Sequence, residues 1–149
     1  MSYSPILIPV VALVGWSLVV FVWMLIARGA AFRRMGVTLS NIPRGSRGAN
    51  LDGCGEDEAQ WKSHNYNHLM EQPTLFYAIA ITLALMGMGG GINYWLAWGY
   101  VVFRVLHSLV QCLVNIVAYR LPLFLLASLC LIGLTVHAAA RILHDCGII

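Results

Sequence analysis

Residues 6–27 read ILIPVVALVGWSLVVFVWMLIA, and none of these side chains carries a charge. A helix that crosses the hydrocarbon core of a bilayer needs about 20 apolar residues, so this run is long enough to span a membrane. A cleaved signal peptide is the competing interpretation. It fits less well, because residues 1–5 contain no basic side chain and because the run exceeds the roughly 7–15 apolar residues of a signal sequence. We therefore expect a retained transmembrane helix.

The composition of the whole chain also predicts a membrane protein. Of its 149 residues, 60% are hydrophobic and 10% are charged, whereas soluble domains carry about 25% charged residues. The mean hydropathy is +0.77. The net charge of +3 is small and the basic residues are scattered, so nothing indicates nucleic-acid binding. The cysteines form neither a CxxC motif nor a disulfide-like framework; they are Cys54, Cys112, Cys130 and Cys146.

Three more membrane spans are predicted. They cover about residues 60–88, 93–119 and 121–143. A polar loop at about 28–59 separates the first span from the second, and the second must include polar residues because its apolar part, 74–88, is short. The connections near Gly89 and Leu121 are short, so the last three helices are antiparallel neighbours. The prediction is one all-α domain, an integral membrane four-helix bundle over residues 1–149.

The distribution of basic residues predicts the orientation in the membrane. Of the nine lysines and arginines, Arg104 lies within a span and Arg141 lies on the side of the termini. The other seven flank the first loop and the turn near Leu121; they are Arg28, Arg33, Arg34, Arg44, Arg47, Lys62 and Arg120. Basic residues favour the cytoplasmic side. We expect a cytoplasmic first loop, both termini outside, and a location in a bacterial inner membrane.

Polar side chains occupy the first part of the second predicted helix. His64, His68 and Glu71 are spaced i, i+4 and i+7, so they share one helical face, and Asn67 lies beside them. Pro73 removes a backbone hydrogen bond and is expected to bend the helix. The freed carbonyl needs a partner or water, which indicates a hydrated interior.

A second polar stripe follows the third predicted helix. Arg104, His107 and Gln111 recur at helical spacing, with Ser108 and Asn115 beside them. A charged residue inside a span costs about 2.5–3.5 kcal/mol on insertion scales, so such residues face a partner or a cavity. Arg104 therefore needs an anion.

Three interpretations of these polar residues are open. In the first, Arg104 and Glu71, the only carboxylate in the predicted spans, form a buried ion pair that fixes the helix register. In the second, the polar side chains line a ligand cavity. In the third, His64, His68 and Glu71 bind a metal as a set of two histidines and one carboxylate. The sequence favours the ligand cavity, because there are more polar side chains than one ion pair requires.

Two motifs carry a resemblance to a known family. Residues 67–77 read NHLMEQPTLFY, and residues 104–108 read RVLHS, with Arg120 at the start of the fourth helix. The first motif is similar to the Glu-x-x-Pro-Leu-Phe segment of the MAPEG superfamily, the membrane-associated proteins in eicosanoid and glutathione metabolism. The second resembles the Arg-Val-x-His segment of its prostaglandin-synthase branch. Residues 27–33 resemble the end of helix one in the leukotriene-synthase branch. The resemblance covers nearly the whole chain.

The resemblance implies a homotrimer that binds glutathione between neighbouring subunits on the cytoplasmic side. The residues that match glutathione-contacting positions are Glu71, Arg104, His107 and Arg120. The chain also departs from the family pattern. His64 and His68 stand where the family has arginine and asparagine, and Gln111 stands where it has tyrosine. An imidazole does not reproduce the bidentate grip of an arginine on a carboxylate.

The function expected from this resemblance is a glutathione-dependent transferase or peroxidase acting on lipophilic substrates in the membrane. Arg28 and Arg120 are the catalytic candidates, because a nearby cation lowers the pKa of a thiol and favours the reactive thiolate. The candidate glutathione-binding residues are His64, Asn67, His68, Glu71, Arg104, His107 and Gln111, and no metal is expected. The alternative is a non-catalytic membrane accessory or structural subunit that binds lipid, quinone or a partner protein.

Overall fold

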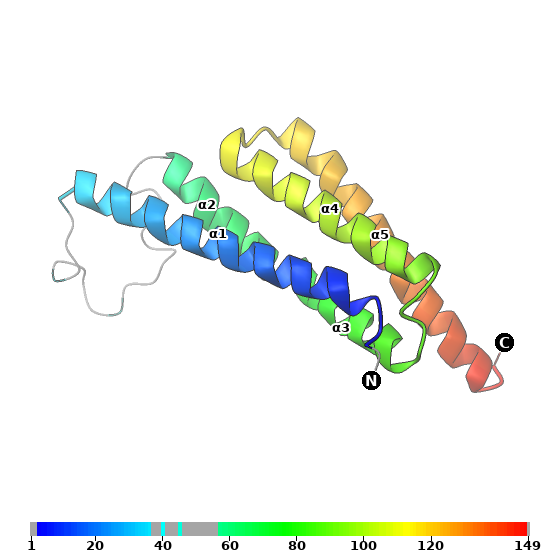
Figure 1. The fold of residues 1–149 in the computed structure, drawn as a ribbon. Coiled ribbons are helices and arrows are strands. Elements are labelled where there is room, and N and C mark those ends of the chain that lie inside the picture. The colour runs from blue at the N-terminus through cyan, green and yellow to red at the C-terminus, as the bar shows by residue number, and fades with distance from the viewer. Residues whose placement is uncertain (1–2, 37–39, 41–44, 46–56, 149) are drawn as a thin grey trace.

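The computed structural model describes residues 3–36, 40, 45 and 57–148 (Figure 1). The sequence predictions that concern Arg44, Arg47 and Cys54 lie outside these residues. Within the described part every regular element is a helix. The helices are α1 (Leu7–Arg34), α2 (Asp57–Leu69), α3 (Gln72–Leu85), α4 (Ile92–Leu113) and α5 (Val117–Asp145).

The helices form an antiparallel bundle of four rods. α2 and α3 follow one another along nearly the same line, so together they make the second rod (Figure 1). α1, α4 and α5 are each long and apolar enough to cross a membrane. In the most apolar windows of α1 and α5 only 22% of the residues are buried, so most of their apolar surface is available to lipid. The predicted all-α membrane bundle is confirmed.

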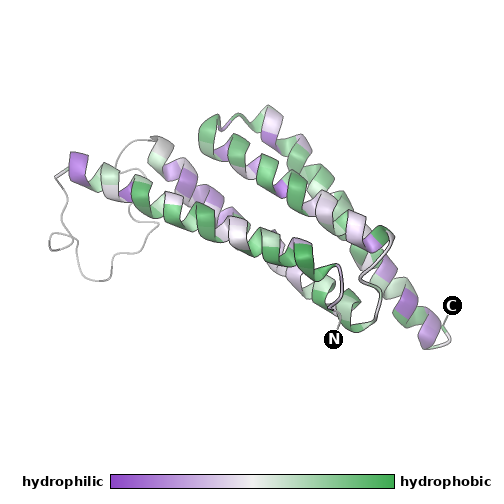
Figure 2. Cartoon of the chain, in the orientation of Figure 1, coloured by the Kyte–Doolittle hydropathy of each residue, from purple (hydrophilic) through white to green (hydrophobic). Residues whose placement is uncertain are grey.

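The second rod is broken rather than bent. Glu71 has φ −90° and ψ −97°, outside the helical region, and Pro73 lies in the first turn of α3. Both the backbone N–H and the hydroxyl of Thr74 donate to the Glu71 carbonyl, at 3.2 and 2.6 Å. These bonds close the first turn of α3 on the Glu71 carbonyl, whereas the bond that Pro73 cannot donate is the one to the Leu69 carbonyl, four residues earlier. α2 and α3 are therefore separate helices. Figure 2 shows that α2 is mainly hydrophilic and α3 mainly hydrophobic.

The turn between α4 and α5 comes earlier than the sequence suggests. α4 ends at Leu113, six residues before the expected end at Tyr119. Asn115 adopts φ 53°, a left-handed conformation that asparagine tolerates better than most residues. Its N–H bonds the carbonyl of Val110 at 2.8 Å and ends the helix. α5 begins at Val117, which places Arg120 in its first turn.

Small residues allow α4 and α5 to approach closely. A Cβ added at Gly99 would lie 3.1 Å from the sulfur of Cys130, and one at Gly133 would lie 3.2 Å from Leu96. Such contacts are typical of membrane helices, whose association depends on close packing. On the other side of the bundle α1 packs against α2, α3 and α4.

Gly89, in the turn between α3 and α4, packs against the N-terminal segment. A Cβ added there would overlap Ser4 Oγ and lie 2.8 Å from the buried Ile6, whereas Gly90 has open space beside it. We expect Gly89→Ala to lower the free energy of unfolding by about 1–3 kcal/mol, the usual range for overpacking. Gly90→Ala, the matched control, should change it by less than about 0.5 kcal/mol. Thermal denaturation in detergent measures both, and equal Tm values for the two variants would contradict the prediction.

Candidate functional site

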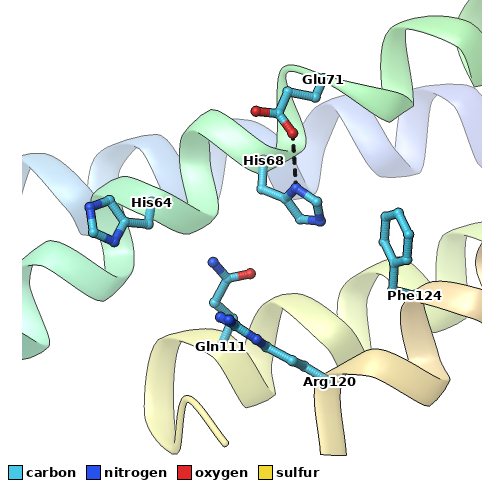
Figure 3. Close-up of a pocket in the computed structure, with 6 residues that line it drawn as sticks. All are labelled: His64, His68, Glu71, Gln111, Arg120 and Phe124. Atoms are coloured by element: carbon cyan, nitrogen blue, oxygen red, sulfur yellow. Dashed lines mark hydrogen bonds and ion pairs between the residues drawn. The ribbon is translucent and has the colours of Figure 1, made fainter. Parts of the chain in front are cut away.

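A polar cavity of about 290 Å³ lies between the second rod, α4 and α5. The residues that line it are His64, His68, Glu71, Gln111, Arg120 and Phe124 (Figure 3). Its lining residues come from α2 and the break after it, from the last turns of α4 and from the first turns of α5. Five of the residues predicted from the sequence to serve catalysis or binding thus meet in one cavity.

The second rod contributes the charged group nearest to solvent. The side chain of Glu71 is 69% exposed, and its Oε2 lies 3.0 Å from Nδ1 of His68 (Figure 3). The break after α2 places this glutamate between the two helices rather than within one. Asn67 is exposed but does not line the cavity.

Arg104 lies beneath the cavity and is fully buried. Its Nε donates to the hydroxyl of Tyr100 at 3.2 Å, and its Nη1 lies 3.2 Å from Nε2 of His68. The guanidinium carbon lies 5.2 Å from the ring centroid of Phe124, within the range of a cation–π contact. Its Nη2 has no hydrogen-bond partner among the described residues.

Hydrogen-bond polarity determines the proton position on His68. A guanidinium has only donors, so Nε2 of His68 must accept the bond from Arg104. The proton of the neutral ring is then on Nδ1, which donates to the Glu71 carboxylate. Glu71 and Arg104 are therefore joined through His68. The direct Glu71–Arg104 ion pair considered from the sequence is not formed, because the imidazole stands between the two side chains.

α4 contributes two more buried polar side chains. The ring of His107 lies 5.1 Å from that of His68, centroid to centroid. Gln111 is 7% exposed and lines the cavity, and within the part of the chain that the structure describes its Oε1 has no hydrogen-bond partner. A buried unpartnered carbonyl costs about 1–3 kcal/mol. A water or ligand in the cavity would relieve this cost.

The two arginines predicted to be catalytic are separated. Arg120 lines the cavity, and its Nη1 donates to Oδ1 of Asn115 at 2.7 Å. Arg28, on α1, does not line it. Sequence reasoning had assigned Asn115 to a helical stripe and overlooked that it orients Arg120. The available signal was an asparagine between two apolar runs, a position where it often ends a helix.

The structure gives the arrangement of the three side chains considered above as metal ligands. Within the described residues no group of three histidine, cysteine, aspartate or glutamate side chains could hold a metal ion. His64, His68 and Glu71 are all described. The ring nitrogens of His68 bond to Glu71 and Arg104 instead.

Fold and cavity together define a helical membrane protein with a polar site at one end of its bundle. The sequence model of the MAPEG family matches residues 6–140, and the chain belongs to this family. The predicted resemblance is confirmed. The family includes glutathione transferases and peroxidases together with other members. Neither the curated proteins nor the solved structures include a match to this chain.

Proposed function

We propose that the chain binds glutathione in this cavity and uses its thiol against lipophilic electrophiles or hydroperoxides dissolved in the membrane. The observation that carries the proposal is that a carboxylate, Glu71, and a guanidinium, Arg120, both line one cavity of a membrane-embedded MAPEG chain. Glutathione carries an ammonium, carboxylates and a thiol. Glu71 would accept hydrogen bonds from the ammonium, and Arg120 would stabilise the thiolate.

The proposed chemistry begins with the thiolate. In a transfer reaction its sulfur forms a bond to an electrophilic carbon, and the electron pair leaves with a halide or takes up a proton. In a peroxidase reaction the sulfur attacks the O–O bond and yields a sulfenic acid and an alcohol. A second glutathione then reduces the sulfenic acid, which gives the disulfide and water. The lipid-facing surfaces of the helices suit the entry of an apolar substrate.

Calorimetry on the purified chain in detergent tests the proposal. We expect saturable glutathione binding that weakens by tenfold or more in Arg120→Ala, the loss of about one charged hydrogen bond. The matched control is Arg141→Ala, an arginine on the same helix whose Nε pairs with Asp145 at 3.0 Å. It should bind as the parent does. An absence of glutathione binding by the parent would reject the proposal.

A non-catalytic accessory subunit is the second candidate. An enzyme of the predicted type should present both Glu71 and Arg104 to the cavity. Glu71 does so, but Arg104 is fully buried behind His68. The burial of Arg104 favours the accessory function. If calorimetry detected no glutathione binding, the accessory function would become the preferred candidate. The proposed assembly is a homotrimer in either case, and native mass spectrometry that found only monomers or dimers would contradict it.

We further propose that the first loop is cytoplasmic. The last turn of α1 carries Arg33 and Arg34, and the first turn of α5, at the same end of the bundle (Figure 1), carries Arg120. The opposite end has Arg141, close to the exposed Cys146. An impermeant maleimide applied to intact cells should therefore label Cys146 and spare Cys54. Cys54→Ser and Cys146→Ser variants show which cysteine carries the label. Labelling of Cys54 would mean that the first loop lies outside, which would contradict the proposed orientation.

A further inference from the structure

His68 stands between the two charged groups of the site, and both of its ring nitrogens are engaged. Nε2 accepts from Arg104 at 3.2 Å, and Nδ1 donates to Glu71 at 3.0 Å. We propose that His68 is a positioning residue, a neutral imidazole held in its Nδ1–H tautomer by Arg104, that aims the Glu71 carboxylate at the ammonium group of the bound ligand. The ligand in this inference rests on the proposed function.

The ring of His68 has no nitrogen left for a ligand. Its side chain is 27% exposed and lines the cavity, but with both nitrogens bonded it offers only carbon atoms to an occupant. The ring is also held from the sides, since its centroid lies 5.1 Å from that of His107 and 5.4 Å from that of Phe124. The imidazole is therefore suited to fix the place of its neighbours rather than to bind the ligand itself.

Glu71 needs such a partner. Its carboxylate is largely exposed, and a free glutamate side chain would lose considerable rotamer freedom on binding a ligand. Among the described side chains, His68 alone is bonded to this carboxylate. The bond uses Oε2 and leaves Oε1 for the ammonium group. A carboxylate oriented in advance binds more tightly, because less freedom is lost on association.

The buried Arg104 explains why His68 keeps its proton on Nδ1 and so holds the Glu71 carboxylate in one orientation. A protonated His68 would place two cations 3.2 Å apart, and the opposite tautomer would set two N–H groups against each other. Both alternatives are unfavourable beside a guanidinium that is fully buried. Arg104 thus acts on Glu71 through His68, although it reaches neither the carboxylate nor the cavity.

Nitrogen-15 NMR of ligand-free protein with labelled histidine tests the tautomer. Resonances that disappear in His68→Gln belong to His68, and we expect a protonated Nδ1 and a bare Nε2. Arg104→Met should abolish this single-tautomer pattern, whereas His137→Phe, which removes a half-buried histidine bonded to Asn93 at 2.7 Å, should leave it unchanged. A protonated Nε2 in the parent, or the same pattern in Arg104→Met, would overturn the proposal.

Binding measurements test the positioning role. The probes are glutathione and glutaryl-cysteinylglycine, which lacks the amino group. His68→Phe leaves the buried arginine without this partner, so the variant to use is His68→Phe combined with Arg104→Met. We expect it to bind glutathione about tenfold more weakly, consistent with the weakening of one charged hydrogen bond, and to bind the deaminated probe as the parent does. His68→Gln, whose amide keeps one donor and one acceptor, should retain most of the affinity for glutathione.

The two ligands separate the possible outcomes. An equal loss for both probes would mean that His68 contacts another part of the ligand, and no loss for either would mean that Glu71 needs no positioning; each overturns the proposal. The effect should also vanish in a Glu71→Gln background. If the parent binds no glutathione, the proposed function and the ligand part of this inference fail together, and the NMR result alone decides the tautomer.

Discussion

Replacing Arg120 by alanine is expected to slow glutathione conjugation by about 100- to 1,000-fold while the bundle stays folded. The thiolate is the reactive form of glutathione, and Arg120 is the cationic side chain that lines the cavity. Loss of one preorganised group that stabilises developing or resident charge typically costs about 10²–10³ in rate. Asn115 holds the guanidinium in place through the 2.7 Å bond to its Nη1, so the group is oriented before the ligand binds. Steady-state rates with an aryl halide in detergent micelles measure the effect.

Two further variants separate charge from orientation. Arg120→Lys keeps the cation but loses the planar fork, and we expect an intermediate rate. Asn115→Gly keeps the left-handed backbone, which has φ 53°, because glycine adopts positive φ freely, but it releases the arginine. Its rate should also be intermediate. An Arg120→Ala variant as fast as the parent would remove Arg120 from the catalytic assignment, and Arg28 of the same or a neighbouring subunit would become the candidate.

The spans were predictable because a bilayer imposes a simple condition on sequence. Apolar runs of sufficient length, such as residues 6–27, must form helices in which every backbone group is bonded internally. The polar positions along the second rod and α4 were predictable for a related reason. A side chain such as Arg104 in a span has to face the protein interior. Periodicity then assigns its neighbours, His107 and Gln111, to the same face.

The details of the site were not predictable because they depend on contacts between helices. Pro73 indicates a distortion, but only the packing decides between a bend and the complete break at Glu71. The spacing of His64, His68 and Glu71 fits a metal site as well as it fits a hydrogen-bonded chain. In the structure His68 belongs to a hydrogen-bonded chain, because Arg104 on α4 occupies its Nε2. No local pattern in α2 contains that information.

The pair Glu71 and Arg104 gives the most direct test of this arrangement. Glu71→Leu should change the free energy of unfolding by less than about 1 kcal/mol, because its side chain is 69% exposed and exposed charge contacts contribute little. Arg104→Met should cost about 1–3 kcal/mol, because His68 and Tyr100 lose a hydrogen-bond partner but no buried anion is left unpaired. The double variant should show the sum of the two costs.

A direct buried ion pair would behave differently. Each single variant would then cost about 3–5 kcal/mol, and the double variant would recover most of the loss. Glutathione affinity supplies the second measurement on the same proteins. Glu71→Leu should bind glutathione at least about tenfold more weakly than the parent. Arg104→Met should lose less affinity than Glu71→Leu. The double variant should match Glu71→Leu, because Arg104 acts on the ligand only through this carboxylate. Rescue of stability in the double variant would contradict the arrangement in which His68 links Glu71 to Arg104. If Glu71→Leu bound glutathione as tightly as the parent, the cavity would not be the glutathione site.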